Sequence, residues 1–274
     1  MSLKDKIQIT GITDQGLVRD HNEDSIGSDE NLGLLVLADG MGGHKGGEVA
    51  SAIAVDSILQ NLQQALPQIT PGNIDKRTGY SLESMAIEKA IKEANQKIYQ
   101  AAQSNSKYEG MGTTIVVLLF YDNRLTIAHV GDSRLYRMRD RLLEQMTRDH
   151  TLLQELVDRG FYSKKEATQS LNKNLVTRAV GVNTSVDIDL LEEVALPGDI
   201  YLLCSDGLTD MIADDLIEDI QLNYRDNLQK MCKELIKQAK DFGGKDNVSV
   251  MLAQVLKEFP ASSGWYSRFF DLFS

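Results

Sequence analysis

The chain has 274 residues, 42% apolar and 25% charged, which is typical of a soluble globular protein and favours one large domain. Its 40 acidic residues outnumber 29 basic ones, and the net charge of −11 disfavours nucleic acid and anionic lipid as partners. Two isolated cysteines exclude a disulfide framework and a cysteine-ligated zinc site, so we expect a reducing, cytoplasmic setting. No leader opens the chain, and no apolar run approaches the roughly 18 residues that span a membrane.

Hydrophobic periodicity predicts six strands and three amphipathic helices. In chain order these are a strand at 33–38, helices around 49–62 and 87–98, strands at 114–121, 124–130, 133–138 and 199–204, a helix around 228–239 and a strand at 248–255. Asp122 and Asn123 tolerate the positive φ of a tight hairpin between two of these strands. Because strands come in runs with helices between the runs, we expect a layered α+β fold with antiparallel sheets.

Two further segments stand apart from this core. Residues 145–180 contain a short helix expected after His150, a stop at Gly160 and a polar stretch, which together indicate a surface flap. The tail, residues 258–274, is rich in aromatic residues, three of them at helical spacing: Trp265, Phe269 and Phe273. We expect the tail to dock on its own domain, in preference to a membrane surface or a partner.

Acidic residues lie beside strand ends at five places. Two predicted strands end in Asp-Gly, at Asp39 and at Asp206, and "RDHNEDS", "HVGDSR" and "GGKDNVSV" supply the rest. A single Asp-Gly after a strand is usually only a turn, so only the five places taken together indicate a site. Carboxylates gathered at one rim are stable when solvated or when cations neutralise them, and hard oxygen ligands suit Mg²⁺ or Mn²⁺ better than zinc. The glycines let carbonyl groups and oxyanions approach such a metal.

Seven motifs extend this pattern from about residue 8 to residue 255. In order they are "VRDHNEDS", "LADGMGGHKGGEVAS", "GMGTTIVV", "AHVGDSRLY", "LVTRAVG", "LLCSDGLTD" and "GGKDNVSV". The series closely resembles that of the metal-dependent type 2C serine/threonine protein phosphatases, in their bacterial branch. The resemblance implies a phosphatase domain over residues 1–257, with two antiparallel sheets packed as a sandwich, helices on both outer faces and a two-metal site at one end.

The resemblance also implies roles for individual residues. Seven match the positions at which the family holds its metals: Asp39, Gly40, Asp206, Asp246, Asp132, Glu23 and Asp24. Asp39 would bridge two Mn²⁺ or Mg²⁺ ions, with the Gly40 carbonyl on one of them, Asp206 and Asp246 on the other, and Glu23 and Asp24 contributing directly or through water. Asp132 would help to hold a third, weaker metal. Arg19 occupies the position that binds the substrate phosphate, and Asn247 follows a ligand as expected.

The implied chemistry is attack on phosphorus by a water molecule that two divalent ions acidify, with charge stabilised by the metals and Arg19. The departing serine or threonine oxygen needs a proton. Animal members have a histidine two positions after the bridging aspartate, where this chain has Met41, so the nearest candidate donor is His44. A solvated loop histidine, with a metal-bound water as the donor, is an equal alternative.

Other classes fit less well. A dinucleotide-binding enzyme would use the glycine-rich turn after residue 38, but Lys45 stands where GxGxxG requires glycine. Cys204 leads into "SDGLTD" and not into the anion-binding loop of a cysteine phosphatase. Two alternatives stay open: a pseudophosphatase that only binds partners, and a phosphatase of a small-molecule ester. The expected partners are phosphoproteins, including a serine/threonine kinase. The sequence does not indicate the oligomeric state, and we expect a monomer.

Overall fold

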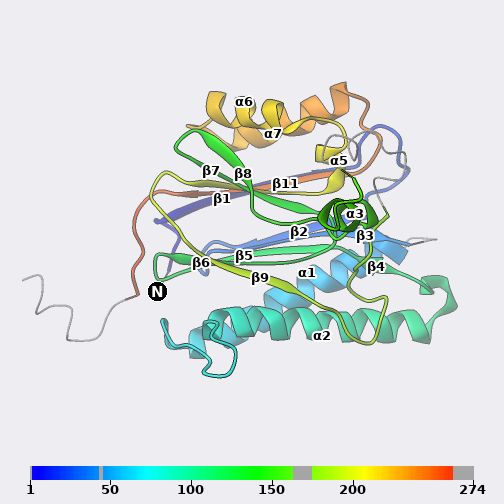
Figure 1. The fold of residues 1–274 in the computed structure, drawn as a ribbon, viewed down its shortest axis with the longest axis horizontal. Helices are drawn as coiled ribbons and strands as arrows, with labels where there is room; N and C mark the ends of the chain where they lie inside the picture. The colour runs from blue at the N-terminus through cyan, green and yellow to red at the C-terminus, as the bar shows by residue number, and fades with distance from the viewer. Residues whose placement is uncertain (1, 43–45, 163–174, 262–274) are drawn as a thin grey trace, which may run out of the picture.

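The computed structural model describes residues 2–42, 46–162 and 175–261, which form two antiparallel sheets stacked face to face (Figure 1). The first sheet has the strand order β1-β11-β10-β7-β8: Ile7–Asp14, Val248–Val255, Ile200–Cys204, Arg134–Arg139 and Leu142–Gln145. The second has the order β2-β3-β5-β6-β9: Asp24–Asp29, Leu34–Met41, Ile115–Tyr121, Arg124–Val130 and Asp189–Val194. A two-residue strand, β4 (Gly112–Thr113), pairs with the end of β3.

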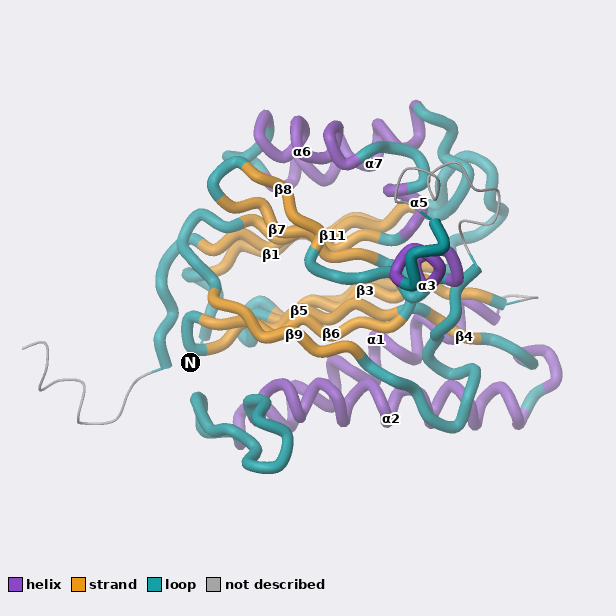
Figure 2. Tube along the Cα trace, viewed as in Figure 1, coloured by secondary structure: helices purple, strands orange, loops and turns teal. Residues whose placement is uncertain are grey.

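Helices cover both outer faces (Figure 2). The second sheet is covered by α1 (Gly46–Ala65) and α2 (Leu82–Ser104), and the first by α6 (Asp214–Asn223) and α7 (Leu228–Asp241). Two short helices, α3 (Leu152–Asp158) and α5 (Asp206–Thr209), lie at the end of the sandwich where β3 and β10 terminate. The predicted α-β-β-α architecture is therefore confirmed.

Burial on both faces explains the uninterrupted apolar run at the start of β3. Leu34 and Val36 pack toward α1 and α2, whereas Leu35 and Leu37 pack toward the first sheet. A strand alternates its side chains between two faces, so a strand that is buried on both sides needs apolar residues at every position. The third core cluster fills the space between the first sheet, α6 and α7.

The predicted elements agree with the observed ones, and the largest differences are at the helix ends, where α1 and α2 are longer than their apolar stripes. The hairpin between β5 and β6 turns at Asp122 and Asn123, with φ of 45° and 55°. The sequence analysis did not predict five strands (β1, β2, β4, β8 and β9) or two helices (α5 and α6). Strands β2, β8 and β9 are mostly only partly buried, so they lack the apolar run that marks the predicted strands.

The predicted flap is described at its base. Its short helix α3 begins after Thr151, whose side chain accepts a hydrogen bond from the Gln154 amide, and the chain turns at Gly160 with a φ of 76°. In the predicted tail, Phe259 is buried and packs edge-on against Phe120 with ring centroids 6.0 Å apart.

The tail aromatics Trp265, Phe269 and Phe273 lie outside the described residues. Among the helices that the structure describes, none is long and apolar enough to cross a bilayer.

Candidate metal centre

The predicted acidic residues meet at one end of the sandwich, where strands of both sheets begin or end. Asp24 opens β2 and pairs in register with Asp39 near the end of β3. From the first sheet, Asp206 follows β10 and Asp246 precedes β11, and Asp132 lies in the turn between β6 and β7. Both sheets therefore contribute carboxylates to the same rim.

Burial and mutual repulsion act strongly on these groups. Burial, followed by the negative charges of Asp24, Asp206, Asp132 and Asp246, raises the pKa of Asp39 well above its usual range. The pKa of Asp206 is raised well above its usual range in the same way, first by burial and then by neighbouring carboxylates. Burial raises the pKa of Asp132 to about 6. A cluster of this kind is stable as carboxylates only when positive charge is brought among them.

Asp24 shows most directly that a cation fits. Its Oδ2 accepts hydrogen bonds from Ser205 Oγ at 2.9 Å and from Ser249 Oγ at 2.6 Å. Its Oδ1 is buried and has no hydrogen-bond partner among the described residues. Burial raises the pKa of this carboxyl to about 6. Buried oxygen atoms without partners are costly, and a divalent cation or the water around it would satisfy this one.

Backbone segments approach one another closely beneath this rim. A Cβ atom on Gly40 would overlap the carbonyl oxygen of Gly47 and would lie 2.6 Å from that of Glu23. The Gly40 amide in turn donates to Glu23 O at 3.2 Å. Glycine is required at position 40 because α1 and the segment before β2 pack against it, a reason that the motif alone did not reveal.

Asn247 organises the loop that carries Arg19. Its Oδ1 accepts a hydrogen bond from the Glu23 amide at 2.8 Å, and its Nδ2 donates to the carbonyl oxygens of Gln15 and His21, each at 2.9 Å. Arg19 is about half exposed, and its Nη2 donates to Asp246 Oδ2 at 2.6 Å. This hydrogen bond is the main reason why the pKa of Arg19 is raised. The arginine therefore lies at the edge of the acidic rim.

Thr114 connects Asp39 with the turn that carries Asp132. Its Oγ1 accepts from the Asp39 amide at 3.2 Å and shares a hydrogen bond with Ser133 Oγ at 2.7 Å, and its amide donates to Asp39 O at 2.8 Å. Sequence reasoning missed Thr114, Ser205 and Ser249. For Ser205 and Ser249 the available signal was a hydroxyl residue within three positions of a motif aspartate, whereas Thr114 has no acidic neighbour in the sequence.

The structure thus brings together nine of the ten predicted site residues: Arg19, Glu23, Asp24, Asp39, Gly40, Asp132, Asp206, Asp246 and Asn247. The tenth, His44, lies outside the described residues. Among the described residues, one group of three metal-binding side chains has a ligand atom from each within 4.8 Å of the others: His129, His150 and Asp189. The described carboxylates of the rim are not drawn together to this extent.

The family model described as protein phosphatase 2C matches residues 17–257, a range that includes all of these positions. The chain belongs to the protein phosphatase 2C family. Among relatives, the serine/threonine phosphatase stp of Listeria monocytogenes is 36% identical over 245 residues, covering 88% of this chain and 93% of the relative. Protein phosphatase PhpP of Streptococcus pneumoniae is 34% identical over 255 residues, covering 92% and 99%.

Solved structures of serine/threonine phosphatases agree with the fold. The Mycobacterium tuberculosis serine/threonine phosphatase PstP superposes with a TM-score of 0.80 at 36% identity, covering 92% of this chain and 100% of that one. A structure of the PstP catalytic domain in complex with two manganese ions has a TM-score of 0.79 at 35% identity, covering 92% and 99%.

Proposed function

We propose that the acidic rim is the catalytic metal centre of a protein serine/threonine phosphatase. Seven residues would hold two divalent cations and a weaker third: Asp39, Gly40, Asp206, Asp246, Glu23, Asp24 and Asp132. The observation that carries this assignment is the mutually repelling group of carboxylates, of which Asp24 and Asp132 are buried and the others partly buried, and in which Asp24 Oδ1 has no protein partner among the described residues. Family membership makes the chain a metal-dependent protein phosphatase whose substrates are phosphoproteins.

The identity of the cations is part of the proposal. The oxygen-only ligand set suits Mn²⁺ and Mg²⁺, and the manganese complex of the PstP catalytic domain supports the first of these. When bound, divalent cations lower the pKa of a water molecule that attacks phosphorus and neutralise charge on the phosphoryl oxygens.

The protein's own groups bind the substrate phosphate and orient it. Arg19 presents a guanidinium at the edge of the rim, where two of its N–H groups can bind a phosphate in a bidentate manner. Asn247 fixes the backbone on both sides of Arg19 through three hydrogen bonds and thereby holds the arginine in place. We assign to His44 the donation of a proton to the departing oxygen.

The wider organisation is proposed as well. Residues 145–180 would form the flap of a domain that spans residues 1–257, followed by the tail 258–274. We propose a cytoplasmic location, supported by the two buried free thiols of Cys204 and Cys232, and a serine/threonine kinase among the partners. A monomer is the proposed state.

The test is phosphate release from a phosphothreonine peptide by metal-stripped protein, titrated with Mn²⁺ or Mg²⁺. Asp39→Asn is expected to abolish release, and Asp56→Asn on the exposed face of α1 is the matched control. A folded protein that releases no phosphate at any metal concentration would instead be a pseudophosphatase. Hydrolysis of p-nitrophenyl phosphate without hydrolysis of the peptide would favour the small-molecule alternative.

A further inference from the structure

The turn that carries Asp132 is held at both of its ends by two consecutive residues, Asp149 and His150. At the first end, the Gly131 amide donates to His150 Nδ1 at 3.1 Å, and the His150 amide donates back to Gly131 O at 2.9 Å. At the other end, Arg134 Nη2 donates to Asp149 Oδ2 at 2.7 Å. Asp132 lies between these two attachments, so its position depends on both.

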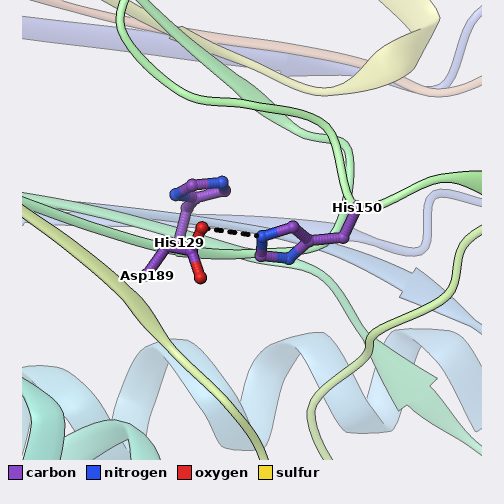
Figure 3. A group of neighbouring side chains, drawn as sticks. All are labelled: His129, His150 and Asp189. Atoms are coloured by element: carbon purple, nitrogen blue, oxygen red, sulfur yellow. Dashed lines mark ion pairs between the residues drawn. The ribbon is translucent and has the colours of Figure 1, made fainter. Parts of the chain in front are cut away.

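The hydrogen bond from Gly131 fixes the proton on the His150 ring. A backbone N–H can only donate, so Nδ1 is the acceptor and a neutral imidazole carries its proton on Nε2. That nitrogen lies 3.3 Å from Asp189 Oδ2 and 3.3 Å from Arg178 Nη1. Because the arginine can only donate, the Nε2 proton is directed to Asp189, the pair that Figure 3 marks. The Nη1 atom of Arg178 also donates to Asp189 Oδ1 at 2.9 Å. Asp189 therefore orients the ring, in the way that a carboxylate orients a catalytic histidine.

The surroundings of the ring keep it neutral. His150 is buried and stacks on His129, with ring centroids 4.6 Å apart and an interplanar angle of 22°. Burial, and then the neighbouring His129, lower the pKa of His150, and burial lowers that of His129. Although burial alone would raise the pKa of Asp189, its hydrogen bond with His150 and the positive charge of Arg178 lower it. A neutral imidazole beside an ionised carboxylate is the pairing that the hydrogen bonds require.

His129, His150 and Asp189 are residue types that bind transition metals, and one ligand atom from each lies within 4.8 Å of the others. However, both ring nitrogens of His150 and both oxygens of Asp189 already face protein groups. His129 uses its Nε2 in a 2.9 Å contact with Arg148 O. Binding a metal at His150 would require a different tautomer and would break the bond to Gly131. The observed contacts therefore favour a hydrogen-bonded connection over a second metal site.

His150 also contacts the last segment of the flap, residues 175–180, which we call the flap base together with α3. The Thr177 amide donates to His150 O at 2.8 Å, and the next residue, Thr151, pairs with Val176 in an isolated bridge. Val180, three residues after Thr177, exchanges two hydrogen bonds with Thr113, at 2.8 and 3.0 Å. The Oγ1 of Thr113 in turn donates to Asp39 O at 2.8 Å. The flap base is thus connected to the Asp132 turn through His150 and to the backbone of Asp39 through Thr113.

We propose that His150 is a positioning residue of the phosphatase. Its imidazole, oriented by Asp189, fixes the Gly131–Asp132 turn and connects that turn to the base of the flap. The inference rests on the proposed function because it gives Asp132 a role in the metal centre. It assigns to the histidine no contact with substrate or metal, only the placement of the carboxylate that has that contact.

Two substitutions separate the contacts of the ring. Asparagine places its Oδ1 near the position of Nδ1, so His150→Asn keeps an acceptor for the Gly131 amide. Glutamine places its amide near Nε2, so His150→Gln loses that acceptor but keeps a polar group toward Asp189. We would measure hydrogen exchange of the Gly131 amide by NMR without substrate, together with kcat and KM for a phosphothreonine peptide at saturating Mn²⁺.

For His150→Gln we expect Gly131 exchange to rise and kcat to fall, each by about 10-fold, with KM changed less than about twofold. His150→Asn is expected to restore most of both values. Equal Gly131 exchange in all three proteins would overturn the proposal, and so would an asparagine variant as impaired as the glutamine variant. A zinc ion bound per chain that is lost in Asp189→Ala would identify a metal site in place of the hydrogen-bonded connection.

The exchange measurement needs no turnover. It therefore tests the contact of His150 even if the wild-type protein releases no phosphate, an outcome that would count against the proposed function alone.

Discussion

Replacing Asp24 by asparagine is expected to stabilise the metal-free protein, although it removes a proposed metal ligand. The pKa of this buried carboxyl is raised from 3.8 to about 6, so its stabilising contribution is complete below pH 3.8 and is lost as the pH rises through 6. At about 1.36 kcal/mol per pH unit, the ionised group costs about 3 kcal/mol at pH 7.5. Asparagine avoids this charge and keeps one oxygen for the two serine hydroxyls, so we expect a net gain of about 2 kcal/mol.

Urea unfolding followed by circular dichroism at pH 7.5 and pH 5 would test this expectation. In EDTA the wild type should gain stability as the pH falls, and the Asp24→Asn protein should gain less. In saturating Mn²⁺ the order should reverse, because the variant binds metal more weakly. Asp56→Asn, an exposed substitution on α1, is the control and should change neither result. An Asp24→Asn protein that is less stable than the wild type in EDTA at pH 7.5 would refute the reasoning.

Three further predictions concern single contacts. Gly40→Ala should lower the free energy of unfolding by about 3 kcal/mol, because its Cβ would overlap backbone atoms. The control Gly79→Ala, at a φ of 79° and with no atom within 4 Å of the added Cβ, should lower it by about 1 kcal/mol. Equal losses of stability for the two variants in urea unfolding would argue against the close approach at Gly40. Asn247→Ala should lower kcat/KM for a phosphopeptide by about 10-fold and should also lower Tm, because a buried side chain with three hydrogen bonds is lost. Unchanged kinetics would show that the Arg19 loop holds without it. Arg139→Met leaves the Asp199 carboxylate, 2% exposed, without its guanidinium and should cost about 3 to 5 kcal/mol in thermal unfolding; a loss below about 1 kcal/mol would contradict this.

Much of the sandwich could be predicted because its central strands are buried on both faces. Residues 34–38 and 115–121 are apolar at nearly every position, and the positive φ that Asp122 and Asn123 tolerate marks the hairpin. The edge strands could not be predicted in the same way. In β9, for example, no residue is fully buried, and its sequence, DLLEEV, has no strand period. The stacking of the two sheets came from the family resemblance and not from periodicity.

The acidic residues of the candidate site could be predicted from their positions at strand ends, but the groups that support them could not. Ser205 and Ser249 bind Asp24 across 181 and 225 residues of sequence, and no local pattern connects them. The role of His150 depends on which ring nitrogen accepts a hydrogen bond, which only coordinates reveal. Local sequence therefore identifies the residues with chemistry, and tertiary contacts decide how they are held.

The two sheets meet differently at the two ends of the sandwich. Between them lies an apolar core, but at the acidic end Asp24 of β2 bonds to two serines of the opposite layer: Ser249 in β11, and Ser205 directly after β10. Cations bound at the acidic end would hold together carboxylates of the two sheets that otherwise repel one another. Removing the cations with a chelator is therefore expected to open this end of the sandwich locally, while the apolar core stays folded. Limited proteolysis would detect such local opening. Cellular turnover of the phosphatase would then depend on metal supply as well as on its overall stability.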